Sequence, residues 1–190
     1  MINQQARLDL QRKRRIGVVE AIWGEHKTSE QIASLLKTLQ MAGELALVTR
    51  VEPIKAKEVA SLVENVKFHE QARCLTLGEP AQLRPSLGQV IVLSGGTSDL
   101  LVAAEAELAL RWHGVNTKVV LDVGVAGLYR LLDQLDHCKN ANVLIACAGM
   151  EGALPTVLAG LLPQPVIGVP ISVGYGVSAG GRTALEGMLA

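Results

Sequence analysis

QVIVLSG (89–95), TKVVLDVG (117–124), NVLIACAG (142–149) and QPVIGVP (164–170) are the four apolar runs that decide the fold of this chain. Each is rich in valine, isoleucine or leucine without alternating polar residues, which is typical of strands buried on both faces. Segments with helical spacing separate the runs, so strand and helix alternate. The sequence therefore predicts an α/β domain in which a parallel sheet is flanked by helices, in three layers.

The first intervening segment, DLLVAAEAELALRWHG (99–114), shows the helical pattern most clearly. Its apolar residues at helical spacing are expected to be core positions: Leu100, Leu101, Ala104, Leu108 and Trp112. Gly114 stands where a C-terminal cap belongs. Two further helices are expected in LYRLLDQLDHC (128–138) and LPTVLAGLL (154–162).

The beginning of the chain is more charged and less regular. Thr28 and Gln31 have the spacing of a capping box, which predicts a helix that ends near Gly43. ELALVTRV (44–51) predicts a strand, and Pro53 suits the first turn of another helix. These elements indicate a small α+β appendage.

The boundary between the two parts is expected in the segment 78–88, which contains glycine, proline and serine. We therefore expect the N-terminal α+β appendage over residues 1–80 and the α/β domain over residues 81–190. At the other end, a helical pattern begins near Ser178 and stops at Ala190 without a capping residue. We expect this domain to be truncated at its C-terminus.

Composition excludes several classes of protein. Lysine plus arginine and aspartate plus glutamate number 18 each, so the formal net charge of +0 provides no long-range field to attract nucleic acid or an anionic membrane. No apolar stretch is long enough to span a bilayer, and the charged N-terminus does not resemble a signal peptide. The three cysteines lack the spacing of a disulfide framework or a zinc site. The sequence predicts a cytoplasmic protein that binds neither nucleic acid nor membranes.

The turn SGGTSD (94–99) lies between a predicted strand and a predicted helix. Glycines let a backbone approach a ligand, and the amides at a helix N-terminus favour an anion such as phosphate. Asp99 would repel phosphate, so it is compatible with holding a ribose hydroxyl, with proton transfer, or with capping the helix. The candidate phosphate-binding residues are Gly95, Gly96, Thr97 and Ser98.

Three more loops follow predicted strands, where ligands of open parallel sheets bind. In AGMEGALP (148–155), Glu151 either stabilises a helix start or takes part in catalysis or binding. Asp122 lines the site or caps the next helix. The loop GYGVSAGG (174–181) either wraps a ligand or acts as a flexible joint. Candidate binding glycines in these loops are Gly149, Gly152, Gly174 and Gly176.

Histidine is absent from all four loops, which argues against a histidine-based triad or metal cluster. The histidines lie at helix ends or in the appendage: His26, His69, His113 and His137. Cys147 lies inside a predicted strand and is interpreted as a buried packing residue rather than a nucleophile. No metal ligand is assigned.

These motifs resemble the phosphoribosylaminoimidazole carboxylase (PurE) superfamily. GGTSD (95–99) is similar to its Gly-Ser-x-Ser-Asp phosphate loop, and AGMEGALPTVLAGLLPQPVIGVP (148–170) to its Ala-Gly-Gly-Ala-Ala-His-Leu-Pro loop and the strand beyond. This chain lacks the two histidines that mark PurE enzymes. The loop that carries the first histidine is replaced by DVGVAGLYR (122–130), and the second histidine is replaced by Ala153. The resemblance therefore disfavours an ordinary aminoimidazole ribonucleotide carboxylase or mutase.

Within this superfamily the chain most resembles the LarB family, both in these loops and in PVIGVPISVGYGVSAGG (165–181) and LDLQRKRRIGVVEAIWGEHKTSEQI (8–32). The resemblance implies carboxylation of the pyridinium ring of nicotinic acid adenine dinucleotide (NaAD) with CO2 or bicarbonate. It also implies hydrolysis of the phosphoanhydride, which gives pyridinium-3,5-biscarboxylic acid mononucleotide and AMP for nickel-pincer cofactor synthesis. Catalysis would involve Asp99, Asp122 and Glu151, in a homo-octamer.

Two alternatives stay open. In the LarB family a cysteine a few residues beyond the motif matching EGMLA (186–190) adds to the ring as nucleophile, so a chain that stops at Ala190 would be a non-catalytic nucleotide-binding relative. The other alternative is a PurE-like carboxylase or mutase. No tightly bound cofactor is expected, and Mg2+ at the diphosphate stays open because its carboxylate ligands resemble ordinary helix caps in sequence.

Overall fold

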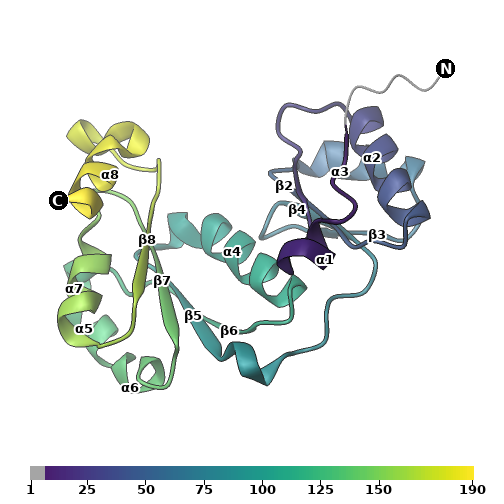
Figure 1. Ribbon diagram of the computed structural model, residues 1–190. Coiled ribbons are helices and arrows are strands. Elements are labelled where there is room, and N and C mark those ends of the chain that lie inside the picture. Colours follow the sequence, from purple (N-terminus) through teal and green to yellow (C-terminus); the bar gives the residue numbers. More distant parts are fainter. Residues whose placement is uncertain (1–6) are drawn as a thin grey trace. The chain divides into compact units, whose positions relative to one another are not determined.

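The computed structural model describes residues 7–190, which form two compact units (Figure 1). One unit ends at Gln82, and the other spans Leu83–Ala190. We refer to them as the N-terminal unit and the C-terminal unit. No helix within residues 7–190 is long and apolar enough to cross a membrane.

The N-terminal unit contains a mixed four-stranded sheet in the order β1-β2-β4-β3. Its strands are β1 (Ala21–Trp23), β2 (Ala46–Thr49), β3 (Val66–His69) and β4 (Cys74–Leu77). β1 and β2 are parallel, whereas β4 runs antiparallel to both of its neighbours. This arrangement confirms the predicted α+β appendage.

Helices α1 (Arg12–Ile16), α2 (Ser29–Met41) and α3 (Pro53–Leu62) complete this unit. The predicted capping box is confirmed, because the Thr28 side chain accepts the Gln31 N–H while the Gln31 side chain accepts the Thr28 N–H. The proline predicted for a first helical turn begins α3. Residues of α2 and α3 pack on one face of the sheet, and this core includes Ile22, Ile32, Leu36, Val48, Val59 and Leu75.

The C-terminal unit contains a four-stranded sheet in the order β6-β5-β7-β8, and every pair of neighbours is parallel. Its strands are β5 (Gln89–Ser94), β6 (Asn116–Val120), β7 (Val143–Ala148) and β8 (Val166–Pro170). In the register, Leu93 of β5 pairs with Val120 of β6 and with Ala146 of β7. The carboxyl ends of the three strands therefore lie at one edge.

Helices cover both faces of this sheet (Figure 1). The helices are α4 (Leu100–Trp112), α5 (Leu128–Leu132), α6 (Leu135–Cys138), α7 (Ala153–Leu161) and α8 (Arg182–Leu189), with 3-10 turns η1 (Pro85–Leu87), η2 (Thr97–Asp99), η3 (Val125–Gly127) and η4 (Gly176–Gly181). Val92 packs with Ala103 of α4, whereas Ile91 and Leu93 pack with the face that α5 and α7 cover. The predicted three-layer α/β architecture is confirmed.

Several local predictions are wrong. Ile167 of β8 is 52% exposed because β8 is the last strand of the sheet and has one neighbour only. Leu101 of α4 is 44% exposed, and the buried positions of that helix are Ala103, Ala104 and Trp112. The last α-helix begins at Arg182 rather than near Ser178.

The late start of α8 has a backbone cause. Gly180 and Gly181 have φ of 78° and 77°, a left-handed conformation that interrupts a right-handed helix. The single helix expected over residues 128–138 is likewise divided, because a turn separates α5 from α6.

Candidate functional site

A cavity of about 390 Å3 lies at the carboxyl edge of the parallel sheet in the C-terminal unit. Its walls come from the loops after β5, β6, β7 and β8, together with the first turn of α7. The lining residues are Gly95, Gly96, Ser98, Asp99, Gly124, Val125, Ala126, Ala148, Gly149, Met150, Glu151, Ala153, Leu154, Val173, Gly174 and Tyr175. Four segments that are distant in sequence therefore contribute to one cavity.

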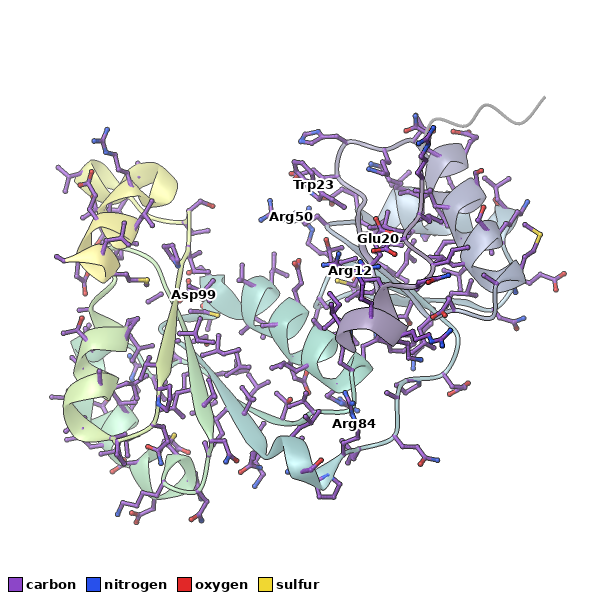
Figure 2. All side chains as sticks on the ribbon, viewed as in Figure 1. Arg12, Glu20, Trp23, Arg50, Arg84 and Asp99 are labelled. Atoms are coloured by element: carbon purple, nitrogen blue, oxygen red, sulfur yellow. The ribbon has the colours of Figure 1, made fainter. Side chains whose placement is uncertain are left out.

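Asp99 closes the turn between β5 and α4, where Figure 2 labels it. Its Oδ2 accepts the N–H of Gly96 at 2.9 Å, and its Oδ1 accepts the hydroxyl of Ser98 at 3.4 Å. The side chain is buried, with 4% exposure of the residue. Asp99 therefore caps the turn and also lines the cavity.

The first N–H groups of this helical segment, at Thr97 and Ser98, have no acceptor within a helix and carry a partial positive charge. Anions bind readily at such a helix start. Gly95 stands next to this turn, and a methyl group there would lie 3.2 Å from Asp99 Oδ2. The turn can thus receive a phosphate or carboxylate group.

Burial raises the pKa of Asp99, and the hydrogen bonds from Gly96 and Ser98 oppose that shift without cancelling it. An acid with a raised pKa holds its proton more tightly, which suits proton transfer near neutral pH. Burial first, and then the Asp99 charge, raises the pKa of Cys147 to about 12.

Cys147 is fully buried in β7, as predicted for a packing residue. With such a pKa the sulfur is a thiol at neutral pH, and the thiolate is the reactive form. None of the three cysteines forms a disulfide, and all three are buried. Cys147 is therefore unsuited to nucleophilic attack in this conformation.

The loop after β6 is held against the turn after β5 by two hydrogen bonds to Ser94. Ser94 Oγ accepts the N–H of Asp122 at 3.2 Å, and Ser94 O accepts the N–H of Val123 at 3.0 Å. A methyl group on Gly124 would lie 2.4 Å from the carbonyl oxygen of Gly95. Only glycine allows this approach, so the two loops form one wall.

Asp122 itself does not line the cavity. Its φ is 57°, an uncommon conformation for a residue with a side chain, and its carboxylate accepts Arg130 Nη1 at 2.5 Å. The side chain of Asp122 is 47% exposed. Asp122 thus pairs with a cation and is not among the lining residues.

The loop after β7 carries Glu151, which lines the cavity and is exposed. Helix α8 supports this loop, because a methyl group on Gly187 would lie 2.3 Å from the carbonyl oxygen of Glu151. Met150 and Gly152, on either side, have φ of 54° and 70°. The left-handed backbone sets the direction of the Glu151 side chain.

The fourth wall comes from the segment after β8. Gly174 and Tyr175 line the cavity, and Tyr175 is 78% exposed at its rim. A methyl group on Gly149 would lie 2.4 Å from the carbonyl oxygen of Val173. The loops after β7 and β8 are therefore in close backbone contact.

The structure brings seven of the eleven candidate residues into the lining and leaves four outside it. Inside are Gly95, Gly96, Ser98, Asp99, Gly149, Glu151 and Gly174, and outside are Thr97, Asp122, Gly152 and Gly176. Sequence reasoning missed the apolar lining and also Ser94, which positions the loop after β6. A signal for Ser94 existed, since it is a hydroxyl at the end of an apolar strand. No signal in the sequence existed for Val125, Leu154 and Val173, because valine and leucine are ordinary core residues.

The chemistry of the lining is limited to a few groups. Asp99 and Glu151 are its carboxylates, Ser98 and Tyr175 supply hydroxyls, and much of the rest is backbone or small apolar side chain. No lysine, arginine or histidine is among the lining residues of the described chain. Within residues 7–190, no group of three or more His, Cys, Asp or Glu residues could hold a metal ion.

Comparison with known proteins agrees with this architecture. Residues 2–79 match the model of the LarB/PurE-like N-terminal domain, and residues 89–190 match that of AIR carboxylase. An uncharacterized protein of Methanocaldococcus jannaschii, MJ0165, is 36% identical over 183 residues, which cover 93% of this chain and 72% of that protein. The N5-carboxyaminoimidazole ribonucleotide mutase of the same organism is 35% identical over 85 residues, which cover 43% of this chain and 52% of that enzyme.

Proposed function

Because this chain belongs to the AIR carboxylase family of the PurE superfamily, and joins that domain to a LarB/PurE-like N-terminal domain, we propose that it is a LarB-type carboxylase and hydrolase. Its substrate would be NaAD. The products would be pyridinium-3,5-biscarboxylic acid mononucleotide and AMP, for nickel-pincer cofactor synthesis. CO2 or bicarbonate would be the co-substrate.

The observation that carries the proposal is the pairing of an anion-binding turn with a buried carboxyl group in one cavity without histidine. A phosphate of the substrate would bind at the N–H groups that begin the helical segment after Gly96. The pyridinium ring would then lie toward Asp99 and Glu151, whose negative charges attract a cationic ring. The apolar side chains of Val125 and Leu154 would exclude water and suit CO2, which is apolar.

The two reactions release protons that these carboxylates could accept. In carboxylation a nucleophile first adds to the electron-poor ring, and the enamine-like carbon that results forms the C–C bond to CO2. The C–H bond at that carbon then breaks and the nucleophile leaves, so one proton leaves the ring. In hydrolysis, water adds to one phosphorus of the anhydride and the other phosphate leaves. We assign the ring proton to Asp99, because its raised pKa makes it the better base. Glu151 would orient water or the ring, and Asp122 would act through the position of its loop.

An aminoimidazole ribonucleotide carboxylase or mutase is the second candidate. The likeness to the Methanocaldococcus jannaschii mutase over 85 residues favours it. The lining of the cavity favours it less, since a PurE-type mechanism uses histidine and Ala153 stands at the position of the second family histidine. A non-catalytic nucleotide-binding relative is the third candidate.

We further propose a cytoplasmic homo-oligomer, an octamer as in the PurE superfamily. Large apolar side chains on the C-terminal unit are exposed at Leu101, Val177 and Leu189, with exposures of 44%, 92% and 77%. Subunit contacts would bury such side chains. Mg2+ enters the proposal only as a counter-ion of the substrate diphosphate.

Incubation with NaAD and bicarbonate, followed by mass spectrometry, tests the proposal. The expected products are AMP and a carboxylated mononucleotide, and 13C-bicarbonate should add one mass unit to the latter. Asp99→Asn should slow formation of the labelled product by about 100-fold or more. Asp133→Asn, which alters an exposed aspartate outside the cavity, should leave it unchanged. Carboxylation of aminoimidazole ribonucleotide instead would support the second candidate, and binding of NaAD without turnover would support the third.

A further inference from the structure

The N-terminal unit contains a cluster of polar and aromatic side chains, held by hydrogen bonds, that the proposed reaction does not use. We define the Trp23 cluster as Trp23, Glu25, His26, Arg50 and Lys55. Trp23 is the last residue of β1 and pairs in register with Thr49, the last residue of β2. The cluster therefore stands at the carboxyl ends of two parallel strands, which is where α/β sheets bind ligands.

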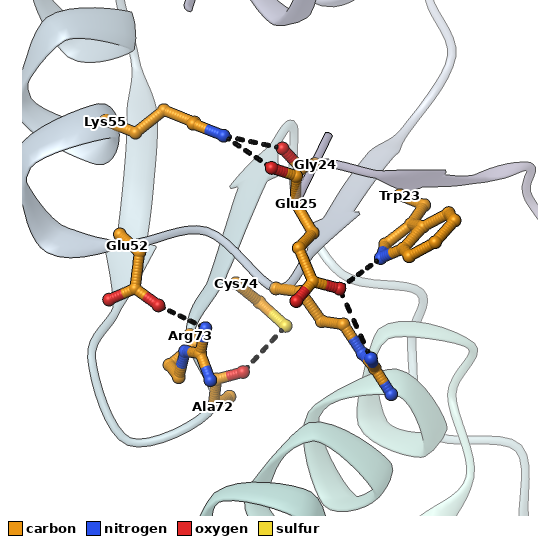
Figure 3. Close-up of polar contacts among 9 residues, drawn as sticks. Trp23, Gly24, Glu25, Glu52, Lys55, Ala72, Arg73 and Cys74 are labelled. Atoms are coloured by element: carbon orange, nitrogen blue, oxygen red, sulfur yellow. Dashed lines mark hydrogen bonds and ion pairs between the residues drawn. The ribbon is translucent and has the colours of Figure 1, made fainter. Parts of the chain in front are cut away.

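One carboxylate oxygen orients the aromatic ring and the cation together (Figure 3). Glu25 Oε2 accepts the indole N–H of Trp23 at 3.1 Å and the guanidinium of Arg50 at 3.3 Å. The ring of His26 meets that of Trp23 edge to face, with centroids 4.7 Å apart and planes at 81°. The indole is thus fixed from two sides.

The loop that carries these residues is anchored to the rest of the unit. Lys55 Nζ donates to the carbonyl oxygens of Gly24 and Glu25 at 3.0 and 2.9 Å, as Figure 3 shows. Gly24 N–H donates to Thr49 O at 2.9 Å, and a methyl group on Gly24 would lie 2.8 Å from Val51 Cγ2. The platform is therefore pre-organised before any ligand arrives.

Stability does not explain this arrangement. Trp23 is 50% exposed and is not among the residues of the unit's hydrophobic core. The ion pair of Arg50 with Glu25 has side chains 57% and 39% exposed, and such pairs contribute little. Arg50 also has φ of 55°, an unfavourable conformation that proteins tend to keep at functional sites.

From this geometry we infer that the N-terminal unit binds a purine mononucleotide at the Trp23 cluster. The exposed indole face would stack on the base. Glu25 Oε1, which lies beside the oxygen shared by Trp23 and Arg50, would accept an exocyclic amine. Arg50 uses one of its five N–H groups on Glu25 and would place others on the phosphate.

The chemistry of the cluster selects this ligand class. Arg50 and Lys55 bring two positive charges against the single negative charge of Glu25, so an anionic ligand is favoured. One aromatic platform fits one base, whereas single-stranded nucleic acid is bound by successive platforms. The inference does not depend on the proposed carboxylation, because it concerns binding alone.

Calorimetric titration of the full chain with AMP tests the inference. Trp23→Leu and Arg50→Gln should each weaken AMP binding by about tenfold or more, the effect expected from losing a base stack or a charge-assisted hydrogen bond. Tyr129→Leu, which removes another exposed aromatic ring, is the matched control and should leave the affinity unchanged. Quenching of tryptophan emission by AMP, absent in Trp23→Leu, would place the base on Trp23.

Ribose 5-phosphate, which lacks a base, should neither quench the emission nor compete with AMP. The inference is overturned if AMP does not bind, if Trp23→Leu binds it as well as the parent chain does, or if an adenine oligonucleotide binds while AMP does not. If the parent chain binds AMP but does not turn over NaAD, and Trp23→Leu loses AMP binding, the proposed reaction is refuted and this site is supported.

Discussion

Asp99 Oδ2 lies 2.9 Å from the backbone nitrogen of Gly96 and accepts its N–H, so one buried carboxylate both closes the turn after β5 and faces the cavity. A residue that only capped the turn would not need to line the site. A residue that only acted in catalysis would not need the hydrogen bond. The dual position makes Asp99 the most informative residue to change.

Asp99→Asn should lower the rate of carboxylation by about 100-fold or more, since general acid–base groups typically contribute 10²–10⁴-fold. The amide oxygen can still accept the Gly96 N–H, so the fold should persist. Asp122→Asn should reduce the rate less than about tenfold, because Asp122 lies outside the cavity and is paired with Arg130. Steady-state assays of both variants check this, and equal losses would contradict it.

The pH dependence of stability should also identify Asp99. Because its pKa is raised above the ordinary 3.8, the folded chain holds this proton more tightly than the unfolded chain does. This contribution to the free energy of unfolding is therefore present at low pH and is lost as pH rises from about 3.8 through the folded pKa. Urea unfolding of the parent chain and of Asp99→Asn should be measured at several pH values. As pH rises, the free energy of unfolding of the variant should increase relative to that of the parent chain. A pH-independent difference would refute the assignment.

Gly124→Ala should disturb the contact between two walls of the cavity. The added methyl group would lie 2.4 Å from the carbonyl oxygen of Gly95, and backbone cannot move aside as a flexible side chain can. We expect a loss of about 1–3 kcal/mol in the free energy of unfolding, together with weaker substrate binding. Gly160→Ala in α7 is the control, since nothing lies within 4 Å of the new methyl group. The free energy of unfolding of that control should increase by about 0.4–1 kcal/mol.

Gly187→Ala should displace the loop that carries Glu151, although the two residues are far apart in sequence. Its methyl group would lie 2.3 Å from the carbonyl oxygen of Glu151, so α8 must shift or the loop after β7 must move. We expect a fall in kcat that exceeds the change in KM for NaAD, because the loop that carries Glu151 would be displaced. Activity like that of the parent chain would show that α8 does not support the loop.

Cys147 should resist alkylation in the folded chain. Its pKa of about 12 and its complete burial leave almost no accessible thiolate at pH 8. Iodoacetamide treatment followed by peptide mass mapping should find Cys147 unmodified in buffer and modified in 6 M urea. Rapid modification in buffer would indicate that β7 opens or that the pKa is far lower.

The sequence alone was sufficient for the elements whose signals are local. The unbroken apolar runs indicated a parallel sheet, because strands with helices on both faces need no polar side. The Thr28–Gln31 pair fixed the start of α2, and Pro53 fixed the start of α3, since both act within a single helical turn. The position of Asp99 after β5 placed it at the carboxyl edge of the sheet, where the cavity lies.

The tertiary structure decided which of the candidate residues meet. Nothing local to Asp122 reveals that it pairs with Arg130, and nothing local to Val173 reveals its approach to Gly149. The order of the strands decided that β8 is an edge strand with Ile167 exposed. Periodicity along a chain is set by near neighbours, whereas burial and the meeting of loops depend on contacts between residues far apart in sequence, which only the packed fold brings together.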